Sequence, residues 1–278
     1  LSRRQRQMCI RDSNMCLAHA LAVNACHEMI PDSKIGPAVS SSVTYPLTCK
    51  PEDVYAARMN DNFKVYYMLD MHQYGEYPGY YMNYLKERNI MPVMEEGDKS
   101  ILKKAKMDFI AVNYYRTNCA EALKADDEHP LGSREGTVDF NMYGLFKMSM
   151  NPNLKATEYG AAIDPSGFRV ALNEYWQRYH LPLIVTENGL GTPDILTEDG
   201  KVHDEYRIDY LRSHIEACAL AIEDGVEMIG YCPWSFMDLL SSAQGFRKRY
   251  GLVYTNRTDD ELLDLKRIKK DSFYWYQN

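Results

Sequence analysis

Apolar residues along this chain gather in short runs separated by longer stretches of helical periodicity. Four runs have the length of a β-strand and few polar residues, at 35–43, 107–114, 183–186 and 228–233. Wholly apolar strands that alternate with helices are typical of a parallel sheet covered on both faces. The pattern alone fits an α/β barrel or a doubly wound sheet, and four strands are half of an eight-stranded barrel.

Helical signals fill the intervals between these strands. Pro51 is followed by two acids and predicts a helix start, because proline is tolerated at the first helical position and acids complement the helix dipole. A helix is expected at 165–179 behind Asp164, which can act as its N-cap. Another is expected at 204–223, ending at Gly225.

The first thirteen residues differ from the rest of the chain. The segment LSRRQRQMCIRDS has four Arg and no apolar periodicity. From Asn14 a helical stripe begins, formed by Met15, Ala18, Ala22, Ala25 and Met29. We therefore expect residues 1–13 to be a non-native or disordered arm and residues 14–278 to form one domain.

Composition narrows the class of partner. The net charge is −7, with 32 basic and 39 acidic residues spread along the chain, so there is no basic stripe suited to a nucleic acid backbone. No apolar run approaches the roughly 20 residues of a membrane helix, and the beginning of the chain lacks the order of a signal peptide. Seven cysteines without a C-x-x-C pair indicate reduced thiols in a cytoplasmic protein. The 22 tyrosines suit a site where sugars stack on aromatic rings, and equally suit packing at a surface.

Polar side chains follow three of the predicted strands. Strand by strand they are Asn113 with Tyr115, Glu187 with Asn188, and Trp234 with Ser235 and Asp238. The carboxyl ends of parallel strands meet at one edge, where α/β enzymes collect their catalytic groups. An isolated T-E-N-G run is equally well a helix cap. The three strand ends together favour an active site with Glu187 at its mouth.

Three runs, F-x-x-x-N-Y-Y, I-V-T-E-N-G and W-S-F-M-D in chain order, resemble glycoside hydrolase family 1, with further similarity in AHALAVNACHEMIPDSKIG, YPLTCKPEDV and IDPSGFRVAL. The resemblance implies a (β/α)8 TIM barrel and a retaining glycosidase, in which one carboxylate attacks the anomeric carbon and a second protonates the leaving oxygen. It implies that Glu187 is the nucleophile and that Tyr115 hydrogen-bonds it. It places Asn113 near the same site, where interior packing is the alternative role.

The family's second carboxylate lies in a T-x-N-E-P run, and this sequence has no such run. The near match Asn173-Glu174 is followed by Tyr175 inside a predicted helix, so we interpret Glu174 as a solvated helix acid. The resemblance then implies that the chain covers roughly the fifth to eighth βα units, without the acid/base strand. We expect such a chain not to hydrolyse glycosides appreciably by itself.

A second group of residues indicates a phosphorylated sugar. Where relatives that act on plain glucosides have a Glu-Trp pair, this chain has Ser241-Ser242, and a serine hydroxyl can donate to a phosphate that a glutamate would repel. The S-x(6)-K-x-Y spacing of Ser241, Lys248 and Tyr250 resembles the phosphate-binding loop of the 6-phospho-glycosidases. Without the serine substitution, K-R-Y would be interpreted as a solvated basic turn. Trp234 is the expected sugar-stacking ring.

These residues predict a 6-phospho-β-glucosidase. Ser242 is small where 6-phospho-β-galactosidases tend to have a bulky aromatic residue, which favours glucosides. The alternatives are a 6-phospho-β-galactosidase, a plain β-glucosidase, or a non-catalytic sugar-phosphate-binding fragment. The expected partner is a small phosphorylated disaccharide or aryl glucoside. We expect no cofactor and no metal, because the histidines lack ligand spacings and the retaining mechanism requires neither.

Overall fold

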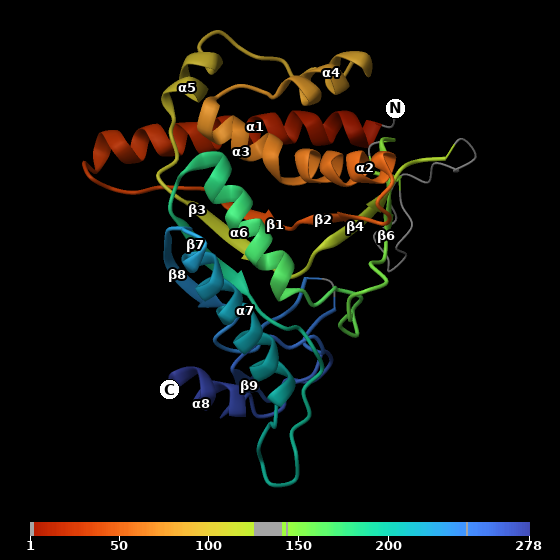
Figure 1. Ribbon diagram of the computed structural model, residues 1–278. Helices are drawn as coiled ribbons and strands as arrows, with labels where there is room; N and C mark the ends of the chain where they lie inside the picture. The colour runs from red at the N-terminus through yellow and green to blue at the C-terminus, as the bar shows by residue number, and fades with distance from the viewer. Residues whose placement is uncertain (1–2, 125–140, 143, 243) are drawn as a thin grey trace.

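The computed structural model describes residues 3–124, 141–142, 144–242 and 244–278 (Figure 1). Its central feature is a parallel sheet of four strands in the order β1-β3-β7-β8. These strands are Ala38–Ser41, Ile110–Tyr114, Leu183–Asn188 and Met228–Pro233. Each coincides with one of the four apolar runs, so the predicted parallel sheet and its four strands are confirmed.

Helices connect and cover these strands. The helices, in chain order, are α1 (Arg3–Met29), α2 (Pro51–Asp61), the π-helix η1 (Asn62–Tyr66), α3 (Tyr67–Tyr74), α4 (Gly79–Glu87), α5 (Asp98–Lys104), α6 (Pro165–Tyr179), α7 (Glu205–Glu223) and α8 (Asp271–Gln277). Helix α2 begins at the proline that predicted it. In Figure 1, α6 crosses the sheet, α1 and α3 are above it in the view, and α7 and α8 are below it.

Two smaller sheets were not predicted. Strands β2 (Thr44–Pro46), β4 (Asn118–Glu121), β6 (Phe146–Ser149) and β5 (Asn141–Met142) form a second sheet, and β9 (Val253–Thr255) pairs with β10 (Arg267–Lys269). Their strands are two to four residues long, too short for a period of two to be recognised.

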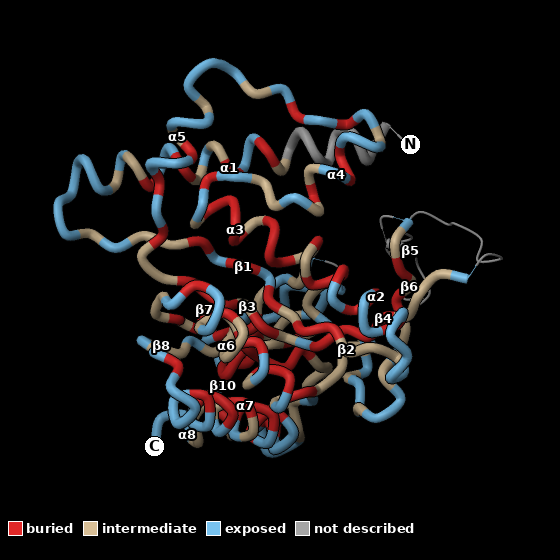
Figure 2. The backbone as a smooth tube through the Cα atoms, turned by 45° about the horizontal axis from the view of Figure 1, so that its top comes forward, coloured by how far each residue is buried: buried red, intermediate tan, exposed pale blue. Residues whose placement is uncertain are grey.

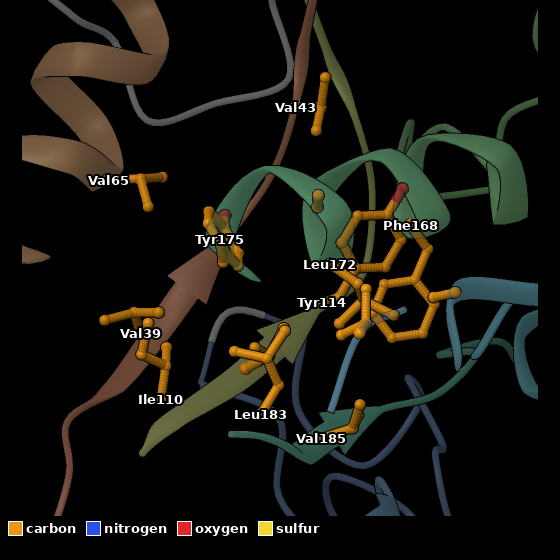
Figure 3. Packing of buried hydrophobic residues seen from close by; sticks show 14 of the residues in the cluster. Val39, Val43, Val65, Ile110, Tyr114, Phe168, Leu172, Tyr175, Leu183 and Val185 are labelled. Atoms are coloured by element: carbon orange, nitrogen blue, oxygen red, sulfur yellow. The ribbon is translucent and has the colours of Figure 1, made fainter. Parts of the chain in front are cut away.

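The main core lies between the sheet and α6 (Figure 3). Val39, Ile110, Leu183 and Val185 come from the strands and are each at most 7% exposed. They pack against the helical side chains Phe168, Leu172 and Tyr175. Figure 2 shows the buried residues concentrated between these elements and the exposed ones on peripheral loops. Apolar strand residues that meet an apolar helix stripe account for this layer.

The opposite face of the sheet is only partly covered. Ala38 and Ser40 alternate with buried neighbours on β1 and are exposed, and Ile229 on β8 has 55% of its surface exposed. The expectation that both faces are covered therefore fails for the described residues, because α6 and its neighbours cover one face only. None of the described helices combines the length and apolar character required to cross a bilayer.

Helix α6 follows local signals in the sequence. The Asp164 side chain accepts a hydrogen bond from the backbone N–H of Gly167 at 2.8 Å, and Pro165 occupies the first turn. The helix ends at Tyr179, after which His180 adopts a left-handed conformation with φ of 50°. The predicted N-cap and both predicted ends of this helix are confirmed.

The N-terminal helix begins earlier than the apolar stripe. Helix α1 starts at Arg3, so the segment that we expected to be disordered is helical from that residue on, while Leu1 and Ser2 lie outside the described residues. Arg, Gln and Met are good helix formers, and a helix requires only backbone hydrogen bonds, so it can extend beyond its packed face. That residues 1–13 are non-native stays a prediction.

A buried carboxyl group lies where α2 meets the π-helix. Asp61 is 4% exposed, and its Oδ1 accepts a hydrogen bond from the Thr44 hydroxyl at 2.6 Å. Burial raises the pKa of Asp61 to about 7, with a smaller upward effect from the charge of Glu174, while the Thr44 bond and Arg58 act downward. The folded state therefore holds a proton that the unfolded chain, with a pKa near 3.8, loses at lower pH.

The free energy of unfolding should therefore decrease as the pH rises from about 4 to about 7, and it should stay at the lower value above pH 7. Asp61→Asn keeps an oxygen that can accept from Thr44 but cannot ionise. We expect it to raise the free energy of unfolding by about 1–3 kcal/mol at pH 8 and to change it little at pH 4. Urea unfolding at both pH values measures this.

The matched control is Asp209→Asn, because Asp209 is exposed and paired with Arg212 on the helix surface. It should give no gain at pH 8. Equal effects of Asp61→Asn at the two pH values would show that Asp61 is not the titrating group.

Candidate active site

Glu187 lies near the carboxyl end of β7, where the ladder to β3 is irregular. Val112 pairs with Val185, but the next pair is Asn113 with Glu187, so Thr186 is an extra residue in β7. A bulge of this kind changes the direction in which the following side chain points. Thr186 uses the displaced position to donate its hydroxyl to Asn113 Oδ1 at 2.6 Å. Asn113 and Glu187 are therefore neighbours on adjacent strands, as the sequence predicted for strand ends.

Tyr115 lies immediately after β3 and contacts Glu187 directly. Its hydroxyl donates to Glu187 Oε2 at 2.6 Å. Burial, the bond to Glu187 and the charge of Glu187 all raise the pKa of Tyr115. The tyrosine therefore keeps its proton and acts as a permanent donor, which fixes the orientation of the Glu187 side chain.

Asn188 is fully buried and connects three elements beneath Glu187. Its amide nitrogen donates to the Tyr114 carbonyl on β3 at 2.7 Å and to the Tyr210 hydroxyl on α7 at 3.2 Å. Its amide oxygen accepts from the Tyr231 hydroxyl on β8 at 2.6 Å. Since Asn188 and Tyr114 are the chain neighbours of Glu187 and Tyr115, this connection holds Glu187 and Tyr115 in register. The sequence analysis placed Asn188 at the strand end but did not identify this role.

Tyr250 lies close to the same carboxylate, and Lys248 lies close to Tyr250. The Tyr250 ring is edge-on to the Tyr115 ring, with centroids 6.1 Å apart. A Cβ at Gly191 would come within 2.6 Å of both Lys248 Cε and Tyr250 Cζ, so the two side chains pack against a position that only glycine fits. Residues predicted as a phosphate loop therefore lie on the segment that follows Glu187.

The Lys248 ammonium group lies over aromatic faces. Its Nζ is 4.6 Å from the Tyr159 ring centroid and 5.5 Å from that of Tyr250. Burial, and secondarily the positive charge of Arg116, lower the pKa of Lys248. No carboxylate forms an ion pair with Lys248 among the residues that the structure describes. This half-buried cation is therefore available to an anion.

Tyr159 was missed by the sequence analysis. Its hydroxyl is buried and has no hydrogen-bond partner in the described part of the chain. Tyr159 and Lys248 are far apart in the sequence, and only the tertiary fold brings them together. No local motif could have shown that this ring lies beside the cation.

Trp234 is held at the end of β8. Its backbone N–H donates to the Asn188 carbonyl at 2.8 Å, and Gly189 packs so closely on the Trp234 carbonyl that a Cβ would come within 1.8 Å of it. The peptide bond between Trp234 and Ser235 is cis. The backbone of this strand end is thus joined directly to the segment that carries Glu187.

The two predicted loop serines are less closely connected to the cluster. Ser241 donates its hydroxyl to Gln244 Oε1 at 3.4 Å and forms a backbone bridge with Gly245. Ser242 is exposed. Within the described ranges no hydrogen bond joins either serine to Lys248 or Tyr250. The structure therefore brings together Glu187, Tyr115, Asn113, Lys248 and Tyr250, and leaves the serines at the rim.

Glu174 lies in α6, away from the strand ends. It accepts a hydrogen bond from the Tyr66 hydroxyl at 2.6 Å and a longer one from Arg58 at 3.4 Å. Its side chain is 27% exposed. Glu174 is thus a partly exposed helix acid with two partners. No three His, Cys, Asp or Glu side chains among the described residues are grouped as metal ligands.

Several known proteins are similar to this chain in sequence. The family model for glycosyl hydrolase family 1 matches residues 2–278. Two aryl-phospho-β-D-glucosidases of Bacillus subtilis, BglC and BglH, are 44% and 45% identical over 94% of this chain and 56% and 53% of their own length. A 6-phospho-β-glucosidase of Dickeya chrysanthemi is 41% identical over 94% of this chain and 54% of its own length. The chain therefore spans about half the length of these curated relatives.

A solved structure agrees with the sequence matches. A family 1 β-glucosidase from Thermotoga maritima superimposes with a TM-score of 0.80 and 32% identity, over 96% of this chain and 54% of that one. The four parallel strands and their helices are thus part of a (β/α)8 barrel, and the predicted fold class is confirmed.

The contribution of the buried Asn188 hydrogen bonds to stability can be tested by substitution. Asn188→Ala leaves the Tyr114 carbonyl and the two tyrosine hydroxyls without their buried partner. We expect a loss of about 2–4 kcal/mol in the free energy of unfolding, because unsatisfied buried polar groups are costly. Asn113→Ala removes one hydrogen bond from a half-buried side chain and should cost about 1 kcal/mol. Urea unfolding of both variants tests this, and equal losses would contradict the three-way role of Asn188.

Proposed function

The chain belongs to glycosyl hydrolase family 1, and on that premise we propose that it carries the nucleophile and the phosphate-recognition residues of a 6-phospho-β-glucosidase. The observation that carries the proposal is the proximity of two groups. Glu187 is bonded to Tyr115 at 2.6 Å, and the rings of Tyr115 and Tyr250 connect it to Lys248. A carboxylate and an anion-binding cation thus lie on one side of the sheet edge.

In the proposed reaction Glu187 attacks the anomeric carbon. A bond forms between its carboxylate oxygen and C1, and the bond from C1 to the aglycone oxygen breaks with its electron pair. Tyr115 holds its proton because its pKa is raised, so it donates a hydrogen bond to Glu187 and does not act as a base. Water then hydrolyses the glycosyl ester, with retention at C1.

A second carboxyl group must protonate the aglycone oxygen in this mechanism. We do not assign this role to Glu174, because it lies in α6 and is bonded to Tyr66 and Arg58. The proposal therefore assigns the nucleophilic step, and not the protonation step, to residues of this chain. Trp234, at the end of β8, is the proposed sugar-stacking ring.

Lys248 supports a phosphorylated substrate. A half-buried ammonium group that has no carboxylate partner among the described residues gains more from a phosphate dianion than from a neutral hydroxyl. The aryl-phospho-β-D-glucosidases BglC and BglH, at 44% and 45% identity, are more similar to this chain than a 1,4-β-D-glucan glucohydrolase of Thermotoga neapolitana at 35%. We propose a 6-phospho-β-D-glucoside as substrate, with Ser241 and Ser242 contributing hydroxyl groups from the rim.

We also propose a cytoplasmic location. The six cysteines whose side chains the structure describes are free thiols. Free thiols persist in reducing compartments. A phosphorylated disaccharide or aryl glucoside would meet the protein there.

The nucleophile can be identified by covalent trapping on this chain. A 2,4-dinitrophenyl 2-deoxy-2-fluoro-6-phospho-β-D-glucoside has a leaving group that departs without protonation, so the second carboxyl group is not required. We expect slow formation of a glycosyl ester on Glu187 and none in Glu187→Gln, because an amide cannot form the ester. Intact-protein and peptide mass spectrometry measure this.

Glu174→Gln is the control and should be labelled like the wild type. Labelling of Glu187→Gln, or an ester on another carboxylate, would show that the nucleophile is misassigned. Absence of labelling in the wild type would contradict the proposal that this chain performs the nucleophilic step.

Phosphate recognition is tested by the ratio of labelling rates for the phosphorylated and unphosphorylated inhibitors. A charge-assisted contact to phosphate contributes roughly 1.5–3 kcal/mol, so Lys248→Ala should lower this ratio about tenfold to a hundredfold. Lys201→Ala should leave it unchanged, because Lys201 is 64% exposed and lies in a separate surface turn. An unchanged ratio in Lys248→Ala would indicate a plain β-glucosidase.

A further inference from the structure

Behind the loop that carries Lys248 lies a chain of six buried charges. Acidic and basic side chains alternate along it, each within ion-pair distance of the next, in the order Asp204, Arg207, Asp194, Lys270, Asp238 and Arg249. None of the six side chains is more than 7% exposed. Asp194 and Asp204 come from the β7–α7 connection, Asp238 and Arg249 from the segment after β8, and Lys270 precedes α8.

At the end of this row of charges that lies nearest to Lys248 in the sequence, the Asp238 carboxylate has several hydrogen-bond donors. Asp238 accepts from the Lys270 ammonium and from Arg249, both at 2.8 Å. It also accepts from the backbone N–H groups of Gly251 at 3.0 Å and Thr255 at 3.3 Å. Buried ion pairs are weak contributors to stability compared with apolar residues of similar volume, but they fix geometry when every partner is satisfied.

Arg249 lies between the two proposed phosphate-binding residues in the sequence. Its backbone N–H and carbonyl pair with Thr192 at 3.0 Å each, which makes this segment extended. Successive side chains of an extended segment point to opposite sides. Lys248 and Tyr250 accordingly pack on Gly191, whereas the guanidinium group of Arg249 points into the buried charges.

The Arg249 guanidinium group makes three contacts that only its fork can make together. It donates to Asp238 Oδ2 at 2.8 Å, to the Thr255 carbonyl at 2.9 Å and to the Arg257 carbonyl at 2.6 Å. A lysine at this position would keep the charge but could not reach all three acceptors in their fixed geometry. The direction of the Lys248–Tyr250 pair is therefore set from behind by one buried side chain.

We propose that Arg249 and Asp238 are positioning residues for recognition of the substrate's phosphate group. They do not touch the substrate. They hold Lys248 and Tyr250 on the side of Glu187. Lys270, which precedes α8, donates to Asp238 and so joins that segment to the same contacts. The inference rests on the proposed function, since it requires Lys248 to bind phosphate.

The test compares the dissociation constants of two probes, methyl 6-phospho-β-D-glucoside and methyl β-D-glucoside, for the 278-residue chain by NMR titration. We expect the wild type to prefer the phosphorylated probe by about tenfold or more. Arg249→Lys should lose most of this preference, by about tenfold, with little change for the plain glucoside. Asp238→Asn should act in the same direction, because it removes the charge that orients Arg249.

Arg178→Lys is the matched control. Arg178 makes a similar two-bond contact to Asp70, at 2.6 and 3.1 Å, on the other side of the core. It should change the thermal stability of the chain but leave the phosphate preference intact. Equal weakening of both probes in Arg249→Lys would indicate a merely structural role and would overturn the inference.

A measurement on the unaltered chain remains decisive if both variants fail to fold. Coupling between two sites is reciprocal, so phosphate binding should stabilise the Asp238 contacts in return. Hydrogen exchange at the Gly251 and Thr255 amides should slow with the phosphorylated probe and not with the plain glucoside. Unchanged exchange would overturn the positioning role. Absence of any phosphate preference in the wild type would instead refute the proposed phosphate recognition itself.

Discussion

The register between β3 and β7 is the constraint on which the arrangement of Glu187 and Tyr115 depends. A parallel ladder brings strand ends to one edge, but it does not by itself align two particular side chains. The extra residue Thr186 shifts the ladder so that Asn113 pairs with Glu187. The buried amide of Asn188 then fixes the shifted ladder through the Tyr114 carbonyl. The 2.6 Å bond from Tyr115 to Glu187 is the consequence of that register.

The interior beneath the strand ends differs in chemistry from the interior beneath the loop that carries Lys248. Beneath the strand ends, the interior is apolar, and α6 packs on the sheet through Phe168, Leu172 and Tyr175. Beneath the loop with Lys248, the interior is ionic and contains Asp238, Lys270 and Arg249. Apolar packing is not directional, whereas charge-assisted hydrogen bonds define the direction of a side chain. A loop without regular secondary structure gains its definite shape from the second kind.

The electrostatics of the site separate the proposed nucleophile, Glu187, from the proposed phosphate-binding cation, Lys248. Glu187 is near a donor that keeps its proton, because burial and the carboxylate both raise the pKa of Tyr115. Lys248 is over the faces of Tyr159 and Tyr250, which interact favourably with a cation without neutralising it. The proposed phosphorylated substrate could therefore contact both charges, since no ion pair joins Lys248 to Glu187 in the described part of the chain.

The sequence by itself determined the elements whose signals are local. The ends of α6 follow from Asp164, Pro165 and the apolar stripe that they precede, and the four parallel strands follow from short runs with few polar residues. The motif around Glu187 indicated the site because strand ends of a parallel sheet share one edge. Motif spacing likewise indicated Lys248 and Tyr250, since both lie in one short segment.

Only the tertiary structure decided which distant residues complete the site. Tyr159 meets Lys248, and Lys270 meets Asp238, across many residues and several elements. The helical state of residues 3–13 and the short β2-β4-β6-β5 sheet also lie beyond the reach of a periodicity argument. The physical reason is the same in each case. Local patterns fix backbone conformation and the buried face, whereas the partner of a buried charge or ring is chosen by how the elements pack.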